Sequence, residues 1–214
     1  MDKSVIIMAG GMGSRYGGLK QIDSFGPNNE SILDYSIYDS LKAGFNKIVI
    51  LSSPKLEQYF QEKYVNIFSK INNASLEIVI QDPKYGLKEF KLPKNRVKPW
   101  GTAHAILCCE NVINESFITI NADDFYGSGT FQKAYDSLSY IEKNNLNVST
   151  ISYLVENTLS ENGGVSRGVC IKDGKKLITI EETHDLVRGG DIVEGHFNGK
   201  KVHHPIGTQV SMNL

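Results

Sequence analysis

Runs of β-branched and other apolar residues recur along the chain and predict a series of buried strands. Four of these runs are almost continuously apolar and lie at Val5–Met8, Lys47–Leu51, Leu76–Ile80 and Phe117–Asn121. Continuous apolar runs of this length are typical of parallel strands that helices cover on both faces. A fifth run, Val148–Leu154, predicts one more strand after them.

The segments between these runs carry the spacing of amphipathic helices. Ser31–Lys42 places apolar residues three and four apart and is followed by Gly44, which predicts a helix with a glycine C-cap. Pro54–Ile71 shows the same spacing, and further helices are expected after Gly101 and over about Thr130–Asn144. Alternating strands and helices predict an α/β fold. We expect a Rossmann-like three-layer α/β/α arrangement around a mostly parallel, mixed sheet.

From about Glu156 the pattern changes to glycines, charged residues and short strands. Strands are expected at Gly168–Ile171, Leu177–Ile180 and Thr208–Met212. Without long helices between them, these strands predict a small antiparallel extension rather than another strand–helix–strand unit. We therefore expect a single domain over residues 1–214, with a core over about 1–155 and the extension over about 156–214.

The composition excludes several classes of function. The chain has 214 residues with ordinary apolar and charged fractions, and its formal net charge of −1 gives no basic field for nucleic acid or anionic lipid. No apolar run approaches the roughly 18 residues that cross a bilayer, and the N-terminus lacks a signal-peptide core. An odd number of cysteines (Cys108, Cys109 and Cys170) without paired spacing argues against disulfides and zinc. Small core residues in a reducing cytoplasm are expected instead.

The segment after the first strand, Ala9–Gln21, concentrates charged and flexible residues that suit a triphosphate. Its glycines lie just past the carboxyl end of a buried strand, where they let the backbone approach a ligand and point N–H groups at phosphate. Arg15 and Lys20 add a planar guanidinium and a compact ammonium. These two cations would neutralise the charge that develops on a departing pyrophosphate.

Two familiar phosphate-binding loops do not fit this segment. A dinucleotide fingerprint needs a glycine three residues past Gly13, where the chain has Tyr16. A P-loop needs Gly-Lys followed by Ser or Thr, whereas Gly18 is followed by Leu19. The segment therefore predicts a glycine-rich phosphate site of another kind.

The Gly-x-Gly-Ser-Arg motif at residues 11–15, followed by Lys20, resembles the signature of the sugar-phosphate nucleotidyltransferase (nucleoside-diphosphate-sugar pyrophosphorylase) superfamily. Together with Lys98–Ala105 and Asn121–Gly127, it is similar to a bacterial nucleotidyltransferase subgroup, and the resemblance runs from the first strand to Asn213. It implies a cytoplasmic enzyme of sugar-nucleotide biosynthesis. Such an enzyme transfers a nucleoside monophosphate from a nucleoside triphosphate to a small phosphorylated acceptor, in this superfamily a sugar 1-phosphate, and releases pyrophosphate.

The resemblance also assigns roles to individual positions. The implied nucleotide-binding residues are Ala9, Gly10, Gly11, Gly13, Ser14, Gln81, Gly101 and Thr102. The implied catalytic residues are Arg15, Lys20 and Asp123, and the implied acceptor-binding residues are Gly168, Glu182 and Asn213. Asp123 ends a buried strand and matches the aspartate that holds Mg²⁺, a cation that prefers oxygen ligands. For its neighbour Asp124, a supporting contact to the metal site and a role as a turn acceptor both remain open.

We expect direct in-line displacement, in which a phosphate oxygen of the acceptor attacks the α-phosphorus. Two alternatives remain open: a cytidylyltransferase for phosphocholine or another non-sugar phosphate, and a nucleotide-binding homologue without catalysis. Relatives carry a second metal-binding aspartate downstream of the segment that matches Asn213, and this sequence ends before that point. We therefore expect either a chain truncated at its C-terminus, with loosely held magnesium, or another carboxylate in place of the missing one. In the truncated chain, an uncovered last strand would favour a homo-oligomer.

Overall fold

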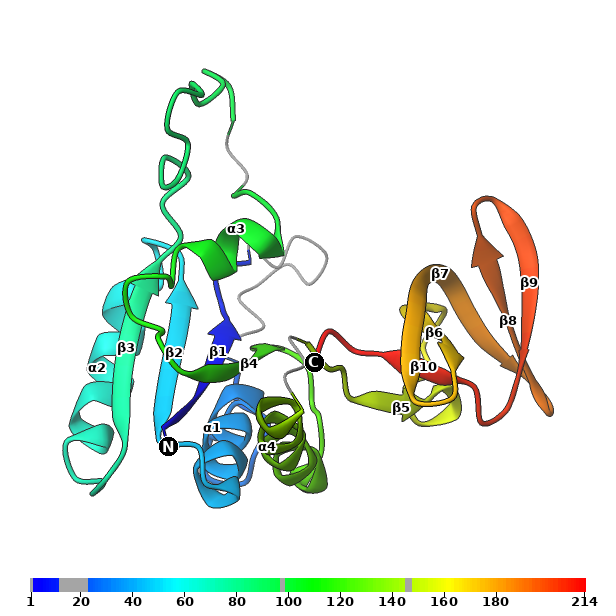
Figure 1. Ribbon diagram of the computed structural model, residues 1–214, viewed down its shortest axis with the longest axis horizontal. Helices are drawn as coiled ribbons and strands as arrows, with labels where there is room; N and C mark the ends of the chain where they lie inside the picture. The colour runs from blue at the N-terminus through cyan, green and yellow to red at the C-terminus, as the bar shows by residue number, and fades with distance from the viewer. Residues whose placement is uncertain (1, 12–22, 97–98, 145–147) are drawn as a thin grey trace. The chain divides into compact units, whose positions relative to one another are not determined.

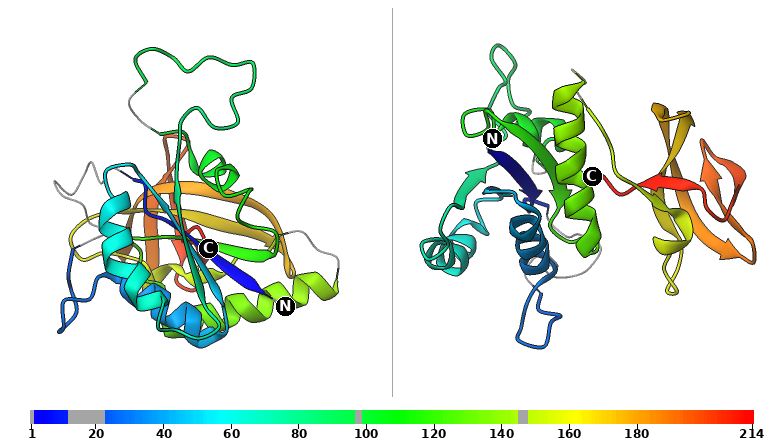
Figure 2. Two further views of the ribbon diagram at one scale, coloured as in Figure 1. Left: turned by 90° about the vertical axis from the view of Figure 1, so that its left-hand side faces the viewer. Right: turned by 60° about the horizontal axis from the view of Figure 1, so that its bottom comes forward.

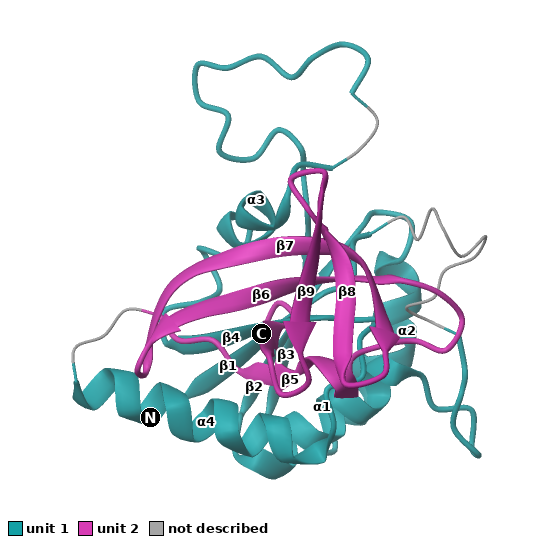
Figure 3. Ribbon diagram, turned by 90° about the vertical axis from the view of Figure 1, so that its right-hand side faces the viewer, with its two compact units in different colours: residues 1–147 teal, residues 148–214 magenta. Residues whose placement is uncertain are grey.

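The computed structural model describes residues 2–11, 23–96, 99–144 and 148–214 (Figure 1). The chain divides into two compact units, residues 1–147 and 148–214, which Figure 3 shows in different colours. The core was expected to extend to about residue 155. In the structure, the boundary between the two compact units falls between residues 147 and 148.

The first unit is built on a four-stranded parallel sheet. Its strands are β1 (Lys3–Met8), β2 (Lys47–Ser52), β3 (Ser75–Ile80) and β4 (Ser116–Asn121), in the order β3-β2-β1-β4. The four continuously apolar runs are confirmed as these strands, with ends that differ by at most two residues. Because all four strands run in the same direction, their carboxyl ends lie at one edge of the sheet.

Helices cover both faces of this sheet (Figures 1 and 2). They are α1 (Ile32–Ala43), α2 (Glu57–Phe68), α3 (Thr102–Leu107) and α4 (Ser128–Lys143). The helix α1 contacts both α2 and α4, whereas α3 packs over β1 and β2 on the other face. The expected α/β class and its layers of helix, sheet and helix are confirmed, and the right-handed crossovers of parallel strands explain the placement of the helices.

The ends of α1 follow from its sequence. Ser31 is the N-cap, and its hydroxyl accepts a hydrogen bond from the backbone N–H of Asp34, whose carboxylate in turn accepts one from the backbone N–H of Ser31. This reciprocal pair is a capping box, worth about 1 kcal/mol for the cap itself. At the other end Gly44 adopts a left-handed backbone conformation with φ of 105°, as expected for a glycine C-cap.

The three cysteines are free and buried. Cys108 and Cys109 pack with Ala105 against Ile6, Val49 and Leu51 under α3. The prediction that these cysteines are small core residues is confirmed. Burial raises the pKa of the Cys109 thiol to about 11, so that this side chain stays protonated and unreactive near neutral pH.

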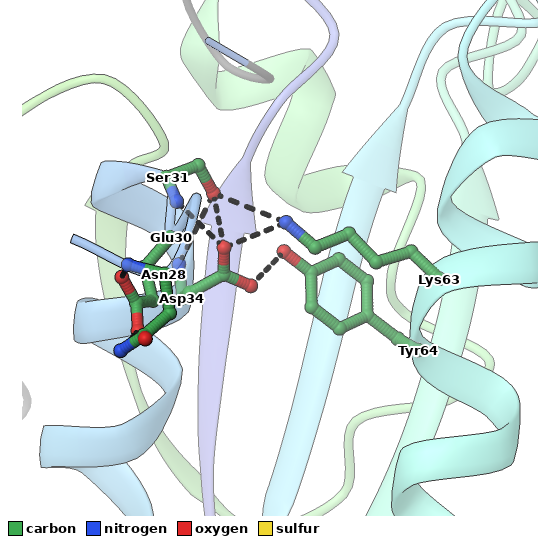
Figure 4. A network of polar contacts seen from close by, with 6 residues as sticks. All are labelled: Asn28, Glu30, Ser31, Asp34, Lys63 and Tyr64. Carbon is green, nitrogen blue, oxygen red and sulfur yellow. Dashed lines mark hydrogen bonds and ion pairs between the residues drawn. The ribbon is translucent and has the colours of Figure 1, made fainter. Parts of the chain in front are cut away.

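A polar network centred on Asp34 ties α1 to α2 (Figure 4). Besides its capping contacts, the Asp34 carboxylate accepts hydrogen bonds from Lys63 Nζ at 2.6 Å and from the Tyr64 hydroxyl at 2.8 Å. Burial acts to raise the pKa of Asp34, but the contacts with Lys63, Ser31 and Tyr64 outweigh it and lower the pKa below its ordinary value. Burial and the adjacent Asp34 charge raise the pKa of the Tyr64 hydroxyl. The ionised carboxylate is therefore the form that holds the two helices together.

Replacing Asp34 by asparagine should lower the free energy of unfolding by about 2 kcal/mol at pH 7, because charge-assisted hydrogen bonds to a half-buried group are lost. The folded-state pKa of Asp34 lies below the unfolded one, so this stabilisation is present above about pH 4 and disappears as the pH falls through the folded-state pKa. Urea unfolding at pH 7 and at about pH 3 measures the difference between Asp34→Asn and the wild type. Glu62→Gln, an exposed change on α2, is the control, and a difference independent of pH would contradict the assignment.

The second unit is an antiparallel sheet. Its strands are β5 (Ser152–Leu154), β6 (Val165–Asp173), β7 (Lys176–Gly189), β8 (Ile192–Phe197), β9 (Lys200–Pro205) and β10 (Gln209–Ser211), in the order β5-β10-β6-β7-β8-β9. A short 3₁₀ helix, Val155–Asn157, follows β5. Five valine and leucine side chains form a core in this unit: Val155, Val169, Leu186, Val193 and Val210. The expected antiparallel extension is confirmed.

The fifth apolar run forms a shorter strand than expected, and this strand lies outside the parallel sheet. Only Ser152–Leu154 of Val148–Leu154 forms a strand, and Val148 is 83% exposed. This strand β5 pairs antiparallel with β10, from the end of the chain, so it belongs to the second unit. The apolar pattern predicts a strand but not its partner, because the partner lies more than 50 residues away.

No helix in the described parts of the chain combines the length and the hydropathy that crossing a bilayer requires.

Candidate functional site

The carboxyl edge of the parallel sheet brings together the polar and glycine segments that follow the strands. Gln81 comes directly after β3, Ala9–Gly11 after β1, and Asp123 two residues after β4. Since β2 and β1 lie between β3 and β4, the two outer segments are separated by about 14 Å, or three interstrand spacings. One edge therefore carries, in this order, an amide, a glycine segment and a carboxylate.

The glycine segment begins as a continuation of β1. The Ala9 N–H donates to the Leu51 carbonyl oxygen at 2.8 Å, and Ala9 is fully buried. Gly10 lies against the end of β2, where a Cβ would be in ordinary van der Waals contact with the Ser52 carbonyl carbon at 3.5 Å, whereas Gly11 is exposed. The backbone thus emerges from the sheet at Gly11. The other expected phosphate-binding residues, Gly13, Ser14, Arg15 and Lys20, lie outside the described residues.

The turn after β4 places Asp123 next to this glycine segment. The Ala122 N–H donates to the Met8 carbonyl oxygen at 3.3 Å, which extends the β1–β4 pairing by one residue. Asp124 accepts a hydrogen bond from the Asn121 side-chain amide at 2.8 Å. Asp124 therefore takes part in the turn, and Asp123 is the carboxylate that follows the buried Ala122 at the edge.

Magnesium fits this carboxylate in one particular way. Among the described residues, no three histidine, cysteine, aspartate or glutamate side chains gather into a cation site. Mg²⁺, however, is commonly held by one or two carboxylates together with substrate phosphates and water. A single carboxylate next to exposed glycine backbone, as at Asp123 and Gly11, is compatible with that donor set.

Gln81 and the residues around Gly101 meet at the other end of the edge. The Gln81 side chain is 7% exposed, and its Nε2 donates to the Trp100 carbonyl oxygen at 3.1 Å. Gly101 is the N-cap of α3 and Thr102 its first residue, and both are exposed. A Cβ at Gly101 would meet no atom within 4 Å, so there is open space in front of this residue. The structure thus brings together the three residues that were expected to surround the nucleobase.

His104 is a member of this cluster that the sequence analysis missed. Its Nδ1 lies 3.3 Å from Gln81 Nε2, and its Nε2 lies 3.0 Å from the Tyr85 carbonyl oxygen. His104 follows Gly101 by three residues, so its place on the helix could have been read from the sequence. Its contact with Gln81, 23 residues away, could not.

The three expected acceptor-binding residues lie on neighbouring strands of the second unit. Gly168 on β6 pairs with Glu182 on β7 and with Ser211 on β10, and Asn213 follows Ser211 by two residues. Glu182 and Asn213 are exposed. A Cβ at residue 168 would lie 2.4 Å from Ile180 Cγ2, so packing against Ile180 is one reason for glycine at this position.

The comparison with protein families decides the assignment. A family model described as Nucleotidyl transferase matches residues 4–183, most of the chain. The chain belongs to the nucleotidyl transferase family. The matched range includes every predicted nucleotide-binding and catalytic residue of this nucleotidyl transferase, and it ends one residue after Glu182. The membership expected from the glycine-rich motif is confirmed.

Three solved structures are similar to this nucleotidyl transferase. UDP-glucose pyrophosphorylase from Acinetobacter baumanii matches with a TM-score of 0.53 and 16% identity over 99% of this chain and 74% of that chain. A UDP-glucose pyrophosphorylase in complex with UDP-glucose gives 0.48 and 18%, over 99% and 76% of the two chains. Rv0371c from Mycobacterium tuberculosis H37Rv gives 0.45 and 12%, over 65% of this chain and 62% of that chain. The chain thus spans less than two thirds of Rv0371c. A comparison with curated proteins gave no match.

Proposed function

We propose that this nucleotidyl transferase moves a nucleoside monophosphate from a nucleoside triphosphate to the phosphate of a sugar 1-phosphate, with release of pyrophosphate. The observation that carries the proposal is the order of groups along the carboxyl edge: Gln81 at β3, Ala9–Gly11 at β1 and Asp123 at β4. An extended nucleotide lies along this edge with its base at Gln81 and its phosphates at the glycines. Ligands of open α/β sheets generally bind at this edge.

The nucleobase end is formed by a side-chain amide and an open backbone turn. The Gln81 amide meets the edge of the base, and Gly101 leaves room for the ring because it has no side chain. Thr102 is exposed beside Gly101 and adds a hydroxyl at the same place. This arrangement suits a flat, polar-edged ring better than an apolar ligand.

At the phosphate end, the reaction needs positioning and charge neutralisation rather than a protein nucleophile. The acceptor phosphate is already an anion, so its oxygen attacks the α-phosphorus directly and pyrophosphate leaves on the opposite side. The backbone at Gly10 and Gly11, with Arg15 and Lys20, holds the triphosphate in line and compensates the charge of the leaving group. Asp123 would hold Mg²⁺, which supplies further positive charge to the phosphate oxygens when bound.

The acceptor side of the proposal rests on the second unit. Glu182 can accept hydrogen bonds from sugar hydroxyls, and the Asn213 amide can donate and accept them. Glu182 pairs with Gly168 across β6 and β7, and Asn213 follows Ser211, the residue of β10 that pairs with Gly168, by two residues. The shared fold with a protein described as UDP-glucose pyrophosphorylase also favours a sugar phosphate as the acceptor over phosphocholine.

The experiment is an assay of pyrophosphate release with each nucleoside triphosphate, Mg²⁺ and a panel of acceptors that contains several sugar 1-phosphates and phosphocholine. We expect release with at least one sugar 1-phosphate and a nucleoside-diphosphate sugar of the corresponding mass. Omission of the acceptor is the control for simple hydrolysis. If pyrophosphate is released with phosphocholine and with no sugar 1-phosphate, the acceptor is a non-sugar phosphate. If triphosphate binds but pyrophosphate is released in no combination, the protein is a non-catalytic homologue.

A further inference from the structure

The amide of Gln81 is held in one orientation by its two acceptors. Its Nε2 lies 3.1 Å from the Trp100 carbonyl oxygen and 3.3 Å from His104 Nδ1. A carbonyl oxygen can only accept a hydrogen bond, so the nitrogen of the amide, not its oxygen, must face Trp100. The reverse orientation would set two oxygen lone pairs against each other.

The imidazole of His104 is fixed by the same reasoning. Its Nε2 lies 3.0 Å from the Tyr85 carbonyl oxygen, which requires the proton on Nε2 and leaves a lone pair on Nδ1 in the neutral ring. Both neighbours of Nδ1 carry hydrogen to donate: Gln81 Nε2, and Cys108 Sγ at 3.8 Å. Nδ1 is therefore an acceptor, and the second N–H of the Gln81 amide points to it.

Tyr85 and Trp100, whose carbonyl oxygens accept these hydrogen bonds, are themselves held in place. The Tyr85 hydroxyl donates to Glu110 at 2.6 Å and its backbone N–H donates to Asp82 at 2.9 Å. The Trp100 indole N–H donates to the Pro83 carbonyl oxygen at 2.8 Å, and the Arg96 guanidinium lies 3.4 Å from the centre of the Trp100 ring. The carbonyl oxygens of Tyr85 and Trp100 thus belong to anchored parts of the chain.

Both N–H groups of the Gln81 amide are therefore used within the protein, and its oxygen Oε1 is the atom that remains for a ligand. We propose that His104 is a positioning residue that fixes the Gln81 amide so that Oε1 accepts a hydrogen bond from the ring N–H of a keto base. This selects uracil, thymine and guanine over cytosine and adenine. The inference rests on the proposed function, in which Gln81 meets the base.

The chemical reason lies in the ring nitrogen of each base. Uracil and thymine at N3, and guanine at N1, carry a proton that Oε1 can accept. Cytosine and adenine carry a lone pair at the same position, which opposes the lone pairs of Oε1. An acceptor on the buried Gln81 side chain that loses its partner costs binding energy, so one such contact supports discrimination of about tenfold between bases.

The test is equilibrium binding of UTP, dTTP, GTP, CTP and ATP, followed by the fluorescence of Trp100, the single tryptophan of the chain. Binding is measured without acceptor, so the result does not depend on turnover. We expect UTP and dTTP to bind about tenfold more tightly than CTP, and GTP about tenfold more tightly than ATP. Pyrimidine nucleotides are compared with each other, and purine nucleotides with each other, so that the size of the base does not affect the comparison.

Two substitutions of His104 separate positioning from simple packing. His104→Asn keeps an acceptor near the place of Nδ1. The preference for UTP over CTP, and for GTP over ATP, should therefore remain within about threefold of the wild-type preference. His104→Gln keeps a donor for the Tyr85 carbonyl but removes the δ acceptor, and the preference should fall to about threefold or less. Gly101→Val, at a position with room for a Cβ and an ordinary φ of −66°, is the control. It should weaken UTP, dTTP and CTP alike, and GTP and ATP alike.

Wild-type binding without a preference for keto bases, or a preference unchanged in His104→Gln, would overturn the inference and leave the proposed function standing. Binding of none of the five nucleotides would overturn both. Because the comparison of nucleotides in the wild type needs no variant, an unstable His104 variant cannot rescue the inference.

Discussion

Lys20→Ala is expected to lower the turnover number by about 10²–10³-fold while the thermal midpoint stays within a degree or so of the wild type. In the proposed reaction, the departing pyrophosphate gains negative charge in the transition state, and the backbone N–H groups of a glycine segment cannot neutralise it alone. Lys20 follows that segment in the sequence, although it lies outside the described residues. Initial rates of pyrophosphate release at saturating substrates measure the effect.

The matched control for Lys20→Ala is Lys70→Ala. Lys70 is exposed in the turn that follows α2, so the same loss of one positive charge occurs away from the carboxyl edge. This control should keep wild-type turnover. Wild-type turnover in Lys20→Ala itself, or equal losses in both variants, would remove Lys20 from the catalytic group.

Asp123→Asn is expected to abolish the gain in nucleotide affinity that Mg²⁺ provides and to lower turnover by about 10³-fold. Asparagine keeps the size of the side chain but loses the negative charge that a hard divalent cation prefers. Nucleotide is titrated with Mg²⁺ and, separately, with a chelator, and binding is followed by Trp100 fluorescence. The ratio of the two affinities measures the coupling between Mg²⁺ and nucleotide. Removal of the metal from the wild type should reproduce the affinity of the variant.

Asp124→Asn provides the comparison for this prediction. Asp124 accepts a hydrogen bond from the Asn121 side chain in the turn, and an asparagine oxygen can accept the same bond. The coupling between Mg²⁺ and nucleotide should therefore remain in Asp124→Asn. If the coupling disappears in Asp124→Asn and persists in Asp123→Asn, the two roles are reversed.

A local sequence signal was overlooked in the second unit. Asn198-Gly199 joins β8 to β9, and both residues have positive φ values of 49° and 74°. Asn-Gly between two short alternating runs is a strong hairpin signal, because both residues tolerate the left-handed conformation of a tight turn. The strands β8 and β9 could therefore have been predicted from the sequence.

The sequence by itself determined the four strands of the parallel sheet, the helices that follow them and the glycine C-cap of α1, because these features depend on neighbours within a few residues. It also led to the prediction of a ligand site at Gly10, Gly11 and Asp123, which follow buried strands by two or three residues. The family followed from motifs that are contiguous in the chain.

Only the tertiary structure decided which distant residues meet. Gln81 and His104 come from different elements, and the orientation of the Gln81 amide depends on carbonyl groups of Trp100 and Tyr85 that no pattern of side chains reveals. The contact of Asp34 with Lys63 and Tyr64, and the pairing of β5 with β10, have the same origin. Local patterns reflect the backbone and burial of one segment, whereas hydrogen bonds between segments depend on how the chain folds back on itself.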